Sequence, residues 1–434
     1  VDTGIRAADV VREAATLGLD VVITDHHLPD GDLPSALAVL NPNLPGCQYP
    51  DKHLCGAGVA FKLVQALLDR LEWPADKRRR MMDSFLKLVA IATIADVVPL
   101  TGENRVIVKR GLAALRNVRN PGLRALLEVS GLAEGGSPSS GQVAFRIAPR
   151  MNAAGRMSSA EEVIELLLTE DEERARALAA QLHALNQERQ QTEAGIVRRV
   201  LEECTLIPVG DDQAALVFCG EGWHRGVVGI VASRLVERFH RPVFVLGEEN
   251  GHAQGSGRGI RNFHLLEALE SMSDLFVRFG GHKQAAGVTL PGDRVVEFRD
   301  RLNAYAGERL SAQDFRETIE IDGAIELEEA TDDAVLEVLS LAPFGYANPA
   351  PLFYVRNAEL YGPPQVLKDQ HRILRLRQNG RMLRVKAWNF GEREATFAPG
   401  DRVDAVLSFE DDPYSANRGY APWSSTLKDI RGAR

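Results

Sequence analysis

The sequence predicts an α/β protein with a doubly wound parallel sheet, a long connecting helix, a second α/β domain and a C-terminal β barrel. Residues 1–168 alternate short apolar runs with helical patterns, which is typical of a parallel sheet covered by helices. Residues 170–204 contain no proline and many strong helix formers, which predicts one long helix. Residues 311–434 contain alternating runs separated by turn signals such as QNGR and APGD, which favours a small β barrel or sandwich.

The predicted elements follow from local patterns along the chain. A helical spacing of apolar residues covers 7–18, and the β-branched run Val21, Val22 and Ile23 predicts a buried strand. Similar patterns predict helices over 57–71, 84–95, 160–168, 225–239 and 331–341 and strands over 214–218 and 242–247. We expect four parts, at 1–168, 169–204, 205–310 and 311–434, which suits a chain of 434 residues.

Composition excludes several classes of protein. Hydrophobic residues make up 45% and charged residues 26% of the chain, as in ordinary globular proteins. No apolar run approaches the ~18 to 20 residues of a membrane span, so we expect a cytoplasmic protein without a membrane partner. The four cysteines form no C-x-x-C pair, which predicts reduced structural thiols rather than zinc ligands. Because the chain begins with VDTG and no methionine, we expect it to lack an N-terminal segment.

Polar side chains directly follow the first predicted strand. Asp25, His26 and His27 come at its carboxyl end, where open α/β sheets bind their ligands. Asp2 in VDTG and Asp96 in IATIADVVPL lie at other expected strand or helix ends. A mixture of carboxylate and imidazole groups suits Mn²⁺, with Mg²⁺ also possible. Two such ions a few ångström apart can promote hydrolysis of a phosphate ester, so the pattern points to that chemistry.

Each of these acids also has a simpler interpretation. A single Asp at the end of a strand is usually a turn or helix-cap residue, and this applies to Asp2 and to Asp96. Asp96, however, interrupts an apolar stretch in which an unpaired carboxylate would be costly. Two consecutive histidines after a buried strand are also unusual. The residues alone therefore leave the metal and the structural interpretations open.

Several motifs in order resemble the DHH phosphoesterase superfamily. VDTG, TDHH and IADVVPL resemble its DHH domain, and RFGGHKQAAG at 278–287 resembles the companion DHHA1 domain. FRIAPRMNAAGRM (145–157), GWHRGVVGIVASRLVERFHRPV (222–243) and GSGRGI (255–260) are similar to the RecJ family of single-stranded-DNA-specific 5′ to 3′ exonucleases. The resemblance covers the chain from Val1 to its last residue. It implies a DHH-type parallel sheet, a DHHA1 domain and an OB-fold barrel.

The resemblance implies a metal centre that hydrolyses phosphodiester bonds. It makes Asp2, His26 and Asp96 metal ligands, with Asp2 bridging two Mn²⁺ or Mg²⁺ ions in the complete protein. Asp25 would orient a histidine, and His27 would face the scissile phosphate or complete the metal surroundings. The family also has an aspartate-rich motif of the form D-x-D-x-D-G, which has no match in this sequence. We therefore expect this chain by itself to bind metal weakly and to hydrolyse little.

Cationic side chains in glycine-containing segments are candidate contacts for the DNA strand. Taken alone, such residues are usually solvated arginines or parts of structural turns. With the resemblance, we assign Arg150, Asn152 and Arg156 to the DNA path beside the metals. We assign Ser256, Arg258 and His282 to the 5′ end of the strand, and Trp223, His224 and Arg225 to a further wall of that cleft, with a core position as the alternative for Trp223.

The strands of the predicted barrel place cations on one face. In RILRLRQ and RMLRVKAW, a period of two puts leucine and valine on one side and Arg375, Arg377, Arg384, Lys386 and Trp388 on the other. Although the whole chain has a net charge of −9, residues 341–434 carry 14 Lys and Arg against 10 Asp and Glu. Cations beside an aromatic side chain are what an OB-fold uses to bind single-stranded nucleic acid.

These observations favour an enzyme, a Mn²⁺-dependent exonuclease that degrades single-stranded DNA in recombination and repair. The partners implied are single-stranded DNA, a single-strand-binding protein and a helicase. One alternative is a non-catalytic scaffold that binds single-stranded DNA, but the intact Asp25, His26 and His27 triplet and Asp96 argue for retained chemistry. Another is a phosphodiesterase for short oligonucleotides or cyclic dinucleotides. The long helix and the basic barrel argue against it, because a dinucleotide needs neither.

Overall fold

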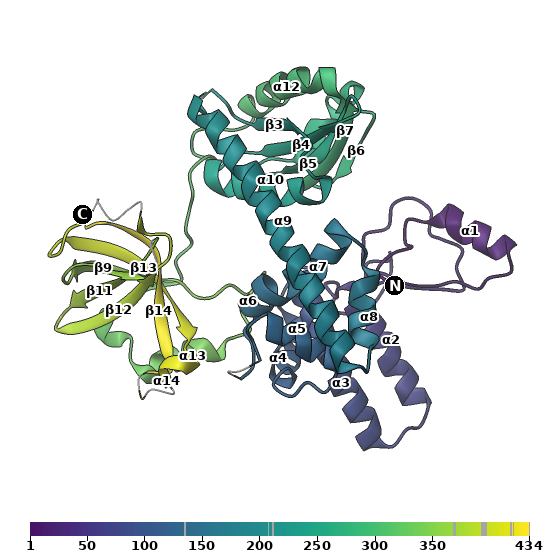
Figure 1. Ribbon diagram of the computed structural model, residues 1–434, viewed down its shortest axis with the longest axis horizontal. Coiled ribbons are helices and arrows are strands. Elements are labelled where there is room, and N and C mark those ends of the chain that lie inside the picture. Colours follow the sequence, from purple (N-terminus) through teal and green to yellow (C-terminus); the bar gives the residue numbers. More distant parts are fainter. Residues whose placement is uncertain are drawn as a thin grey trace. The chain divides into compact units, whose positions relative to one another are not determined.

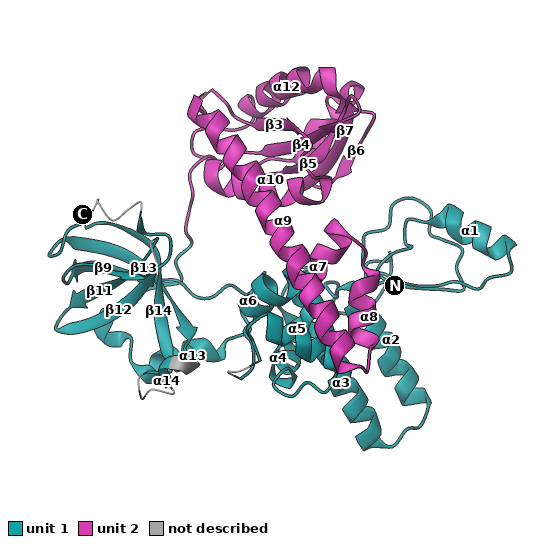
Figure 2. Cartoon of the chain, viewed as in Figure 1, with its two compact units in different colours: residues 1–149, 320–434 teal, residues 150–319 magenta. Residues whose placement is uncertain are grey.

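The structure is a computed structural model that describes residues 1–133, 136–206, 208–210, 212–367, 370–391, 397–416, 419 and 421–433. It divides into two compact units (Figure 2). Unit 1 comprises Val1–Pro149 and Glu320–Arg434, and unit 2 comprises Arg150–Ile319. The chain therefore builds part of unit 1, then the whole of unit 2, and then returns to complete unit 1.

The first part of unit 1 contains a small parallel sheet. Strand β1 (Val22–Thr24) pairs in parallel with β2 (Ala38–Leu40), and α1 (Ala8–Thr16) precedes them. Ile23 is buried, as expected for the central residue of a β-branched run. The sequence predicts a doubly wound parallel sheet in this part of the chain. Among the described residues, that sheet is represented by β1 and β2.

Helices form the rest of this part of unit 1. They are α2 (Gly56–Arg70), α3 (Ala75–Ala95), α4 (Gly102–Ala114), α5 (Pro121–Val129), α6 (Ser140–Gln142) and the π-helical turn η1 (Val143–Ile147). The turn η1 continues into α7 (Ala148–Met157), which belongs to unit 2 from Arg150 onward. Helix α3 packs against both α2 and α4. Gly111 allows the close approach of α4, since a Cβ at this position would lie 2.3 Å from Cβ of Ala90. The predicted helices at 57–71 and 84–95 are therefore confirmed as α2 and as the second half of α3.

A long helix runs through unit 2. Helix α9 (Glu172–Leu206) has 35 residues and, at ~1.5 Å per residue, a length of about 50 Å. Its first half packs against α8 (Glu161–Leu168), where Arg174 forms an ion pair with Glu165. Its second half packs against α10 (Arg225–Phe239). The long helix predicted over 170–204 is thus a single element.

A mixed five-stranded sheet forms the remainder of unit 2 (Figure 1). The strand order is β3 (Leu216–Glu221), β4 (Val243–Glu249), β5 (His252–Arg258), β7 (Ala285–Pro291) and β6 (Arg278–Gly281). Only the β3–β4 pair is parallel. Side chains such as Phe218 and Val245 pack with α9 and α10, whereas Phe244 packs on the opposite face with α11 (Leu265–Glu270) and α12 (Val295–Gly307). The 3-10 turns η2 (Ser273–Leu275) and η3 (Gly292–Arg294) connect these elements.

The C-terminal part of unit 1 is a closed five-stranded β barrel. Its strands are β9 (Phe353–Leu360), β11 (His371–Gln378), β12 (Arg381–Ala387), β14 (Trp423–Gly432) and β13 (Arg402–Asp411), and the barrel closes because β11 pairs with β9 as well as with β12. The elements around it are β8 (Gly323–Ala324), η4 (Leu327–Glu329), α13 (Asp332–Ser340), β10 (Gln365–Leu367) and α14 (Pro413–Ala416). Val355, Leu374 and Leu407 fill the interior. The predicted OB-like barrel is confirmed.

The segment that leads into the barrel contacts the first part of the same unit, at the connection between α3 and α4 and at the start of α6. The amide of Leu100 donates a 2.8 Å hydrogen bond to the carbonyl of Tyr346. The Ser140 hydroxyl donates to the carbonyl of Phe344, 204 positions along the chain. A Cβ at Gly345 would lie 2.7 Å from Cδ1 of Leu100, so glycine permits this contact. The two stretches of unit 1 are therefore joined by specific contacts.

The division into four parts that we expect from the sequence stays a prediction. The two compact units have other boundaries than those four parts. Helix α8 belongs to unit 2 since it packs along α9, whereas the sequence analysis assigns 160–168 to the first domain. Among the described residues, no helix combines the length and the apolar character needed to cross a membrane.

Candidate metal centre and nucleic-acid-binding surfaces

Three side chains from distant parts of unit 1 meet at the carboxyl end of β1. Nε2 of His26 lies 3.2 Å from Oδ1 of Asp2 and 3.5 Å from Oδ2 of Asp96. His26 follows β1, Asp2 lies on the segment before α1, and Asp96 is the C-cap of α3. His27 also takes part, since Asp2, His26 and His27 offer ligand atoms that all lie within 4.8 Å of one another. The structure therefore brings together all the residues that we predicted as metal ligands.

Asp25 lies beneath this cluster and is only 1% exposed. Its Oδ2 accepts a 3.0 Å hydrogen bond from the amide of Ile5, and its Oδ1 accepts from the amides of His26 and His27 and lies 2.7 Å from Nδ1 of His27. Burial by itself raises the pKa of Asp25, but these hydrogen bonds outweigh it and lower the pKa below its ordinary value. Asp25 is therefore placed to act on His27 through a hydrogen bond, as expected for a residue that orients a histidine.

Two asparagines after β2 hold the backbone of the histidine pair. Nδ2 of Asn41 donates to the carbonyl of His27 at 2.8 Å, and Nδ2 of Asn43 donates to the carbonyl of His26 at 2.7 Å. The amide of Asn43 in turn donates to Oδ1 of Asn41. This pair was not predicted from the sequence, although LNPN supplies polar residues directly after the strand adjacent to β1.

The position of Asp2 depends on a close backbone contact. The amide of Asp2 donates a 2.7 Å hydrogen bond to the carbonyl of Thr24, and Asp2 has a φ of 60°. Its carboxylate lies against Gly56, the first residue of α2, where a Cβ would be 2.1 Å from Oδ1. Gly56 is therefore a second residue that sequence reasoning missed, and no local pattern of spacing indicates it.

The donor set fits a divalent cation. Two carboxylates lie on either side of one imidazole nitrogen, and a mixture of oxygen and nitrogen donors of this kind suits Mn²⁺, and Mg²⁺ less well. Burial raises the pKa of Asp96; His26 opposes this shift, and the Asp2 carboxylate adds to it. A bound cation would relieve the repulsion between the two acids. The residues present thus fit a metal ion, with Asp2, His26 and His27 as the set whose ligand atoms all lie within 4.8 Å of one another. Asp96 is a further candidate ligand, which approaches His26 at 3.5 Å.

A cationic cluster lies at the N-terminus of α10 in unit 2. His224 is the N-cap of α10 and accepts a hydrogen bond from the amide of Gly226, while Nη1 of Arg156 donates to the Gly226 carbonyl at 3.1 Å. Side chains of Ser256 and Arg258 also approach this helix, because a Cβ at Gly229 would lie 3.5 Å and 3.1 Å from them. The structure thus groups these residues, together with the exposed Arg225, which follows the N-cap.

Two of these arginines lack full solvation. Burial and, in addition, the nearby Arg189 lower the pKa of Arg156. Burial and the Arg156 guanidinium likewise lower the pKa of Arg258. Both groups keep their charge at neutral pH, because an arginine pKa stays far above it. Their mutual repulsion makes the cluster suited to an anion.

The other candidates in unit 2 have different surroundings. Trp223 is 8% exposed and packs in the core between α10 and the sheet, so the prediction that its ring lines the DNA cleft is wrong and the core alternative holds. Arg150 donates from Nε to Nδ1 of His183 on α9. Asn152 and His282 are exposed, the latter in the turn between β6 and β7.

The outer face of the barrel shows the predicted alternation but fewer free cations. Arg375 on β11 stands directly opposite Arg384 on β12, and Arg384 is exposed. Arg377 instead forms a bidentate ion pair with Glu359, and Lys386 lies 3.1 Å from Asp412. The use of this face for nucleic-acid binding stays a prediction. Arg377 and Lys386 are paired with acids on β9 and after β13, whereas Arg375 lies 5.8 Å from the ring centroid of Tyr361.

Aromatic side chains accompany these cations. Trp388 is 49% exposed and meets the His371 ring edge-to-face at 4.9 Å. The Arg377 guanidinium lies 4.4 Å from the ring centroid of Tyr361. Sequence reasoning did not identify Tyr361, which directly follows β9, or His371, which begins β11.

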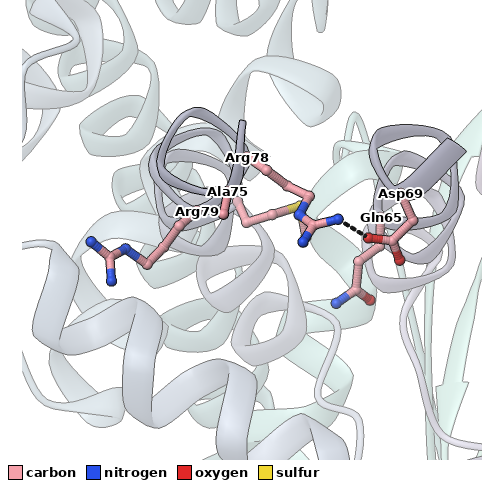
Figure 3. A pocket seen from close by; sticks show the side chains of 6 residues that line it. Gln65, Asp69, Ala75, Arg78 and Arg79 are labelled. Carbon is pink, nitrogen blue, oxygen red and sulfur yellow. Dashed lines mark hydrogen bonds and ion pairs between the residues drawn. The ribbon is translucent and has the colours of Figure 1, made fainter. Parts of the chain in front are cut away.

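A cleft of about 250 Å³ lies between α2 and α3 (Figure 3). Arg78 reaches across it from α3 and forms a 2.7 Å ion pair with Asp69 on α2. Gln65, Ala75, Arg79 and Met82 complete its lining. None of the candidate site residues borders this cleft, so it is separate from the metal centre.

Comparisons with known proteins agree with this architecture. Residues 1–93 match the profile of the DHH family, N-terminal domain; 211–308 match the DHHA1 domain; and 321–420 match the RecJ OB domain. The single-stranded-DNA-specific exonuclease RecJ of Bacillus subtilis is 42% identical over 409 residues, which are 94% of this chain and 50% of that protein. The structure of RecJ from Thermus thermophilus in complex with Mn²⁺ matches with a TM-score of 0.82 and 35% identity over 100% of this chain and 61% of that one.

A further structure, of exonuclease RecJ bound to manganese, is 39% identical with a TM-score of 0.60 and covers 72% of this chain and 77% of that one. The chain belongs to the RecJ family. It spans between 50% and 63% of the length of the six RecJ proteins with which it shares 34 to 42% identity. Within the RecJ framework, Asp2, Asp25, His26 and His27 fall inside the DHH match, and Asp96 lies three positions beyond its end.

Proposed function

We propose that this chain is the part of a RecJ-type protein that hydrolyses single-stranded DNA as a metal-dependent exonuclease in recombination and repair. The observation that carries the proposal is the position of His26, whose Nε2 lies between the carboxylates of Asp2 and Asp96. Relatives named as single-stranded-DNA-specific exonucleases support the choice of substrate.

Asp2, His26 and Asp96 would hold a divalent ion, Mn²⁺ in preference to Mg²⁺, and His27 would complete its surroundings or face the scissile phosphate. When bound, the ion supplies an activated water and neutralises charge on the phosphate. Asp25 would hold the His27 ring in one orientation through the 2.7 Å contact at Nδ1. Asn41 and Asn43 fix the backbone from which both rings project.

Two ions serve the complete protein in this proposal, and the aspartate-rich motif that the resemblance associates with further ligands is missing from the sequence. We therefore expect weak metal binding and slow hydrolysis by residues 1–434 alone. We expect the missing motif to lower the rate of hydrolysis and the metal affinity. The reaction itself would be the same as in the complete protein.

Two surfaces would hold the strand. In unit 2, Arg156, Ser256 and Arg258 would bind a terminal phosphate, and Arg225, His224 and His282 would lie beside it. In unit 1, Arg375, Arg384 and Trp388 on the barrel would hold the strand further along. We also propose that digestion runs from 5′ to 3′ and that the protein is cytoplasmic. A helicase and a single-strand-binding protein would supply the substrate.

Substitution of His26 tests the enzyme against a non-catalytic scaffold. The unaltered chain, His26→Ala and the control His252→Ala, an exposed histidine in unit 2, are incubated with Mn²⁺ and end-labelled single-stranded DNA. We expect slow nucleotide release by the unaltered chain and the control, and none by His26→Ala, while all three bind the strand in EDTA. Strand binding without Mn²⁺-dependent release by any of the three would favour the scaffold.

A further inference from the structure

Phe145 has the highest exposed fraction, 82%, of the aromatic side chains in the described residues. It lies in the π-helical turn η1, two residues from Val143 and from Ile147, both of which are completely buried. Residues two positions apart in a helix lie about half a turn from each other, so burial of these neighbours directs Phe145 outward. A single exposed apolar residue is common, and exposure alone does not indicate a binding site.

The backbone around Phe145 is held firmly. The carbonyl of Arg146 accepts a hydrogen bond from the Ser130 hydroxyl, and Nη2 of Arg146 donates to the carbonyl of Gly131 at 3.1 Å. The short helix before η1 begins with a capping box between Ser139 and Gln142. The ring therefore projects from a fixed support. π-Helical turns of this kind occur frequently at functional sites.

The surrounding sequence favours an anionic ligand. Residues 140–157 contain three arginines and no Asp or Glu, although the chain as a whole carries more acids than bases. Arg146 follows Phe145 in the same turn and stays a cation, although its guanidinium donates to the Gly131 carbonyl. An exposed ring on a segment of chain that contains arginine and no Asp or Glu suits a ligand that combines a flat group with negative charge. An acidic protein segment would meet the cations equally well, but it has no need of an exposed ring face.

We propose that Phe145 is a stacking platform for one unpaired nucleobase of the DNA substrate. This inference rests on the proposed function and adds a residue that contacts substrate. Because every base offers a π face, the contact would be independent of sequence. Bases inside a duplex are stacked on both sides and cannot offer a face to the ring, so Phe145 would also contribute to the preference for single strands.

The contact between Phe145 and a base is tested by removing the ring from the protein and, separately, one base from the DNA. Binding of (dT) oligonucleotides is measured by fluorescence anisotropy in EDTA, with single abasic sites placed at successive positions from the 5′ end. We expect one position at which the abasic site weakens binding to the unaltered chain by on the order of tenfold, the usual effect of losing one stacked base. Phe145→Ala should bind the intact strand about tenfold more weakly and lose this position-specific effect.

Further variants separate stacking from loss of structure. Phe145→Trp should keep the abasic profile, and Phe145→Leu should lose it. Phe85→Ala removes another exposed aromatic side chain of unit 1, on α3, and should leave the profile unchanged. Identical abasic profiles for the unaltered chain and Phe145→Ala would overturn the inference, as would a change of oligomeric state caused by Phe145→Ala.

The outcomes also distinguish this inference from the proposed function. Mn²⁺-dependent hydrolysis together with an unaltered abasic profile in Phe145→Ala would reject the platform and keep the exonuclease. Strand binding with a Phe145-dependent profile but no hydrolysis would keep the platform and reject the enzyme. Failure of the unaltered chain to bind single-stranded DNA would reject both.

Discussion

The carboxylate of Asp2 lies so close to the backbone of Gly56 that a Cβ at residue 56 would be 2.1 Å from Oδ1 of Asp2. This separation is far below van der Waals contact, and the next two nearest atoms, Cγ at 2.5 Å and Cβ at 2.6 Å, also belong to Asp2. A side chain at position 56 would therefore displace the carboxylate from His26. The start of α2 acts as a wall that positions one candidate metal ligand.

Gly56→Ala should lower the affinity for Mn²⁺ by at least tenfold, in the range seen when residues that position metal ligands are changed. Isothermal titration calorimetry measures this affinity. Gly195→Ala is the matched control, because nothing lies within 4 Å of its Cβ on α9. The control should keep its Mn²⁺ affinity and gain about 0.5 to 1 kcal/mol in the free energy of unfolding. Equal Mn²⁺ affinities in both variants would contradict the role of Gly56.

Asp25→Asn should destabilise the protein at neutral pH by about 1 to 3 kcal/mol, because hydrogen bonds to a buried charge are lost. The folded state lowers the pKa of Asp25, so the carboxylate stabilises the fold above its ordinary pKa of 3.8. That stabilisation is lost as the pH falls below this value toward the lower folded pKa. Urea unfolding of both proteins in EDTA at pH 7 and near pH 3 measures the difference, which should shrink on acidification. A difference that is constant with pH would show that Asp25 acts through packing.

Asp96→Asn should have the opposite effect on stability in the absence of metal. Burial raises the pKa of Asp96, with a further contribution from Asp2, so ionisation of this group weakens the fold as the pH rises through the raised pKa. The amide avoids this loss. The gain at pH 7 should stay below about 1 kcal/mol, because the side chain is 42% exposed and solvent screens the charge. Thermal unfolding in EDTA should show the gain, and addition of Mn²⁺ should stabilise the unaltered protein more than the variant.

Arg384→Ala and Arg377→Ala should differ in their effect on strand binding. Arg384 is exposed and faces Arg375, whereas Arg377 is held by Glu359 in a bidentate pair. Loss of Arg384 should weaken binding and reduce the slope of log affinity against log salt concentration by about 0.7, the value for one phosphate contact on a single strand. Loss of Arg377 should leave the slope nearly unchanged. Anisotropy titrations between low and moderate salt measure both slopes, and a larger change for Arg377→Ala would reject this use of the barrel face.

Sequence patterns predicted the parts of the site that depend on the end of a strand. Asp25, His26 and His27 follow a buried β-branched run, and this places them at an edge where ligands bind. The alternation of Arg384 and Val385 follows from the period of two in a strand. Family resemblance was needed to connect Asp2 and Asp96 with this edge, because neither spacing nor composition relates residues 2 and 96 to residue 26.

Interactions between distant segments could not be predicted in this way. The ion pair between Arg377 and Glu359 depends on the pairing of β11 with β9, which closes the barrel. Trp223 is followed by histidine and arginine in the sequence but packs into the core, where the backbone at Gly220 and Gly247 approaches its ring and carbonyl closely. The roles of Gly56, Asn41 and Asn43 also depend on contacts between distant segments, and these contacts exist only after the chain has folded.

Unit 1 is assembled from two stretches of chain that the whole of unit 2 separates. During synthesis, Ser140 leaves the ribosome 204 positions before its partner Phe344. At ~5 to 20 residues per second, this interval lasts on the order of 10 to 40 seconds. Unit 2 is continuous and can finish folding in that time, while the surface around Leu100 waits uncovered. A product terminated before the barrel would keep that apolar surface exposed and should be prone to aggregation.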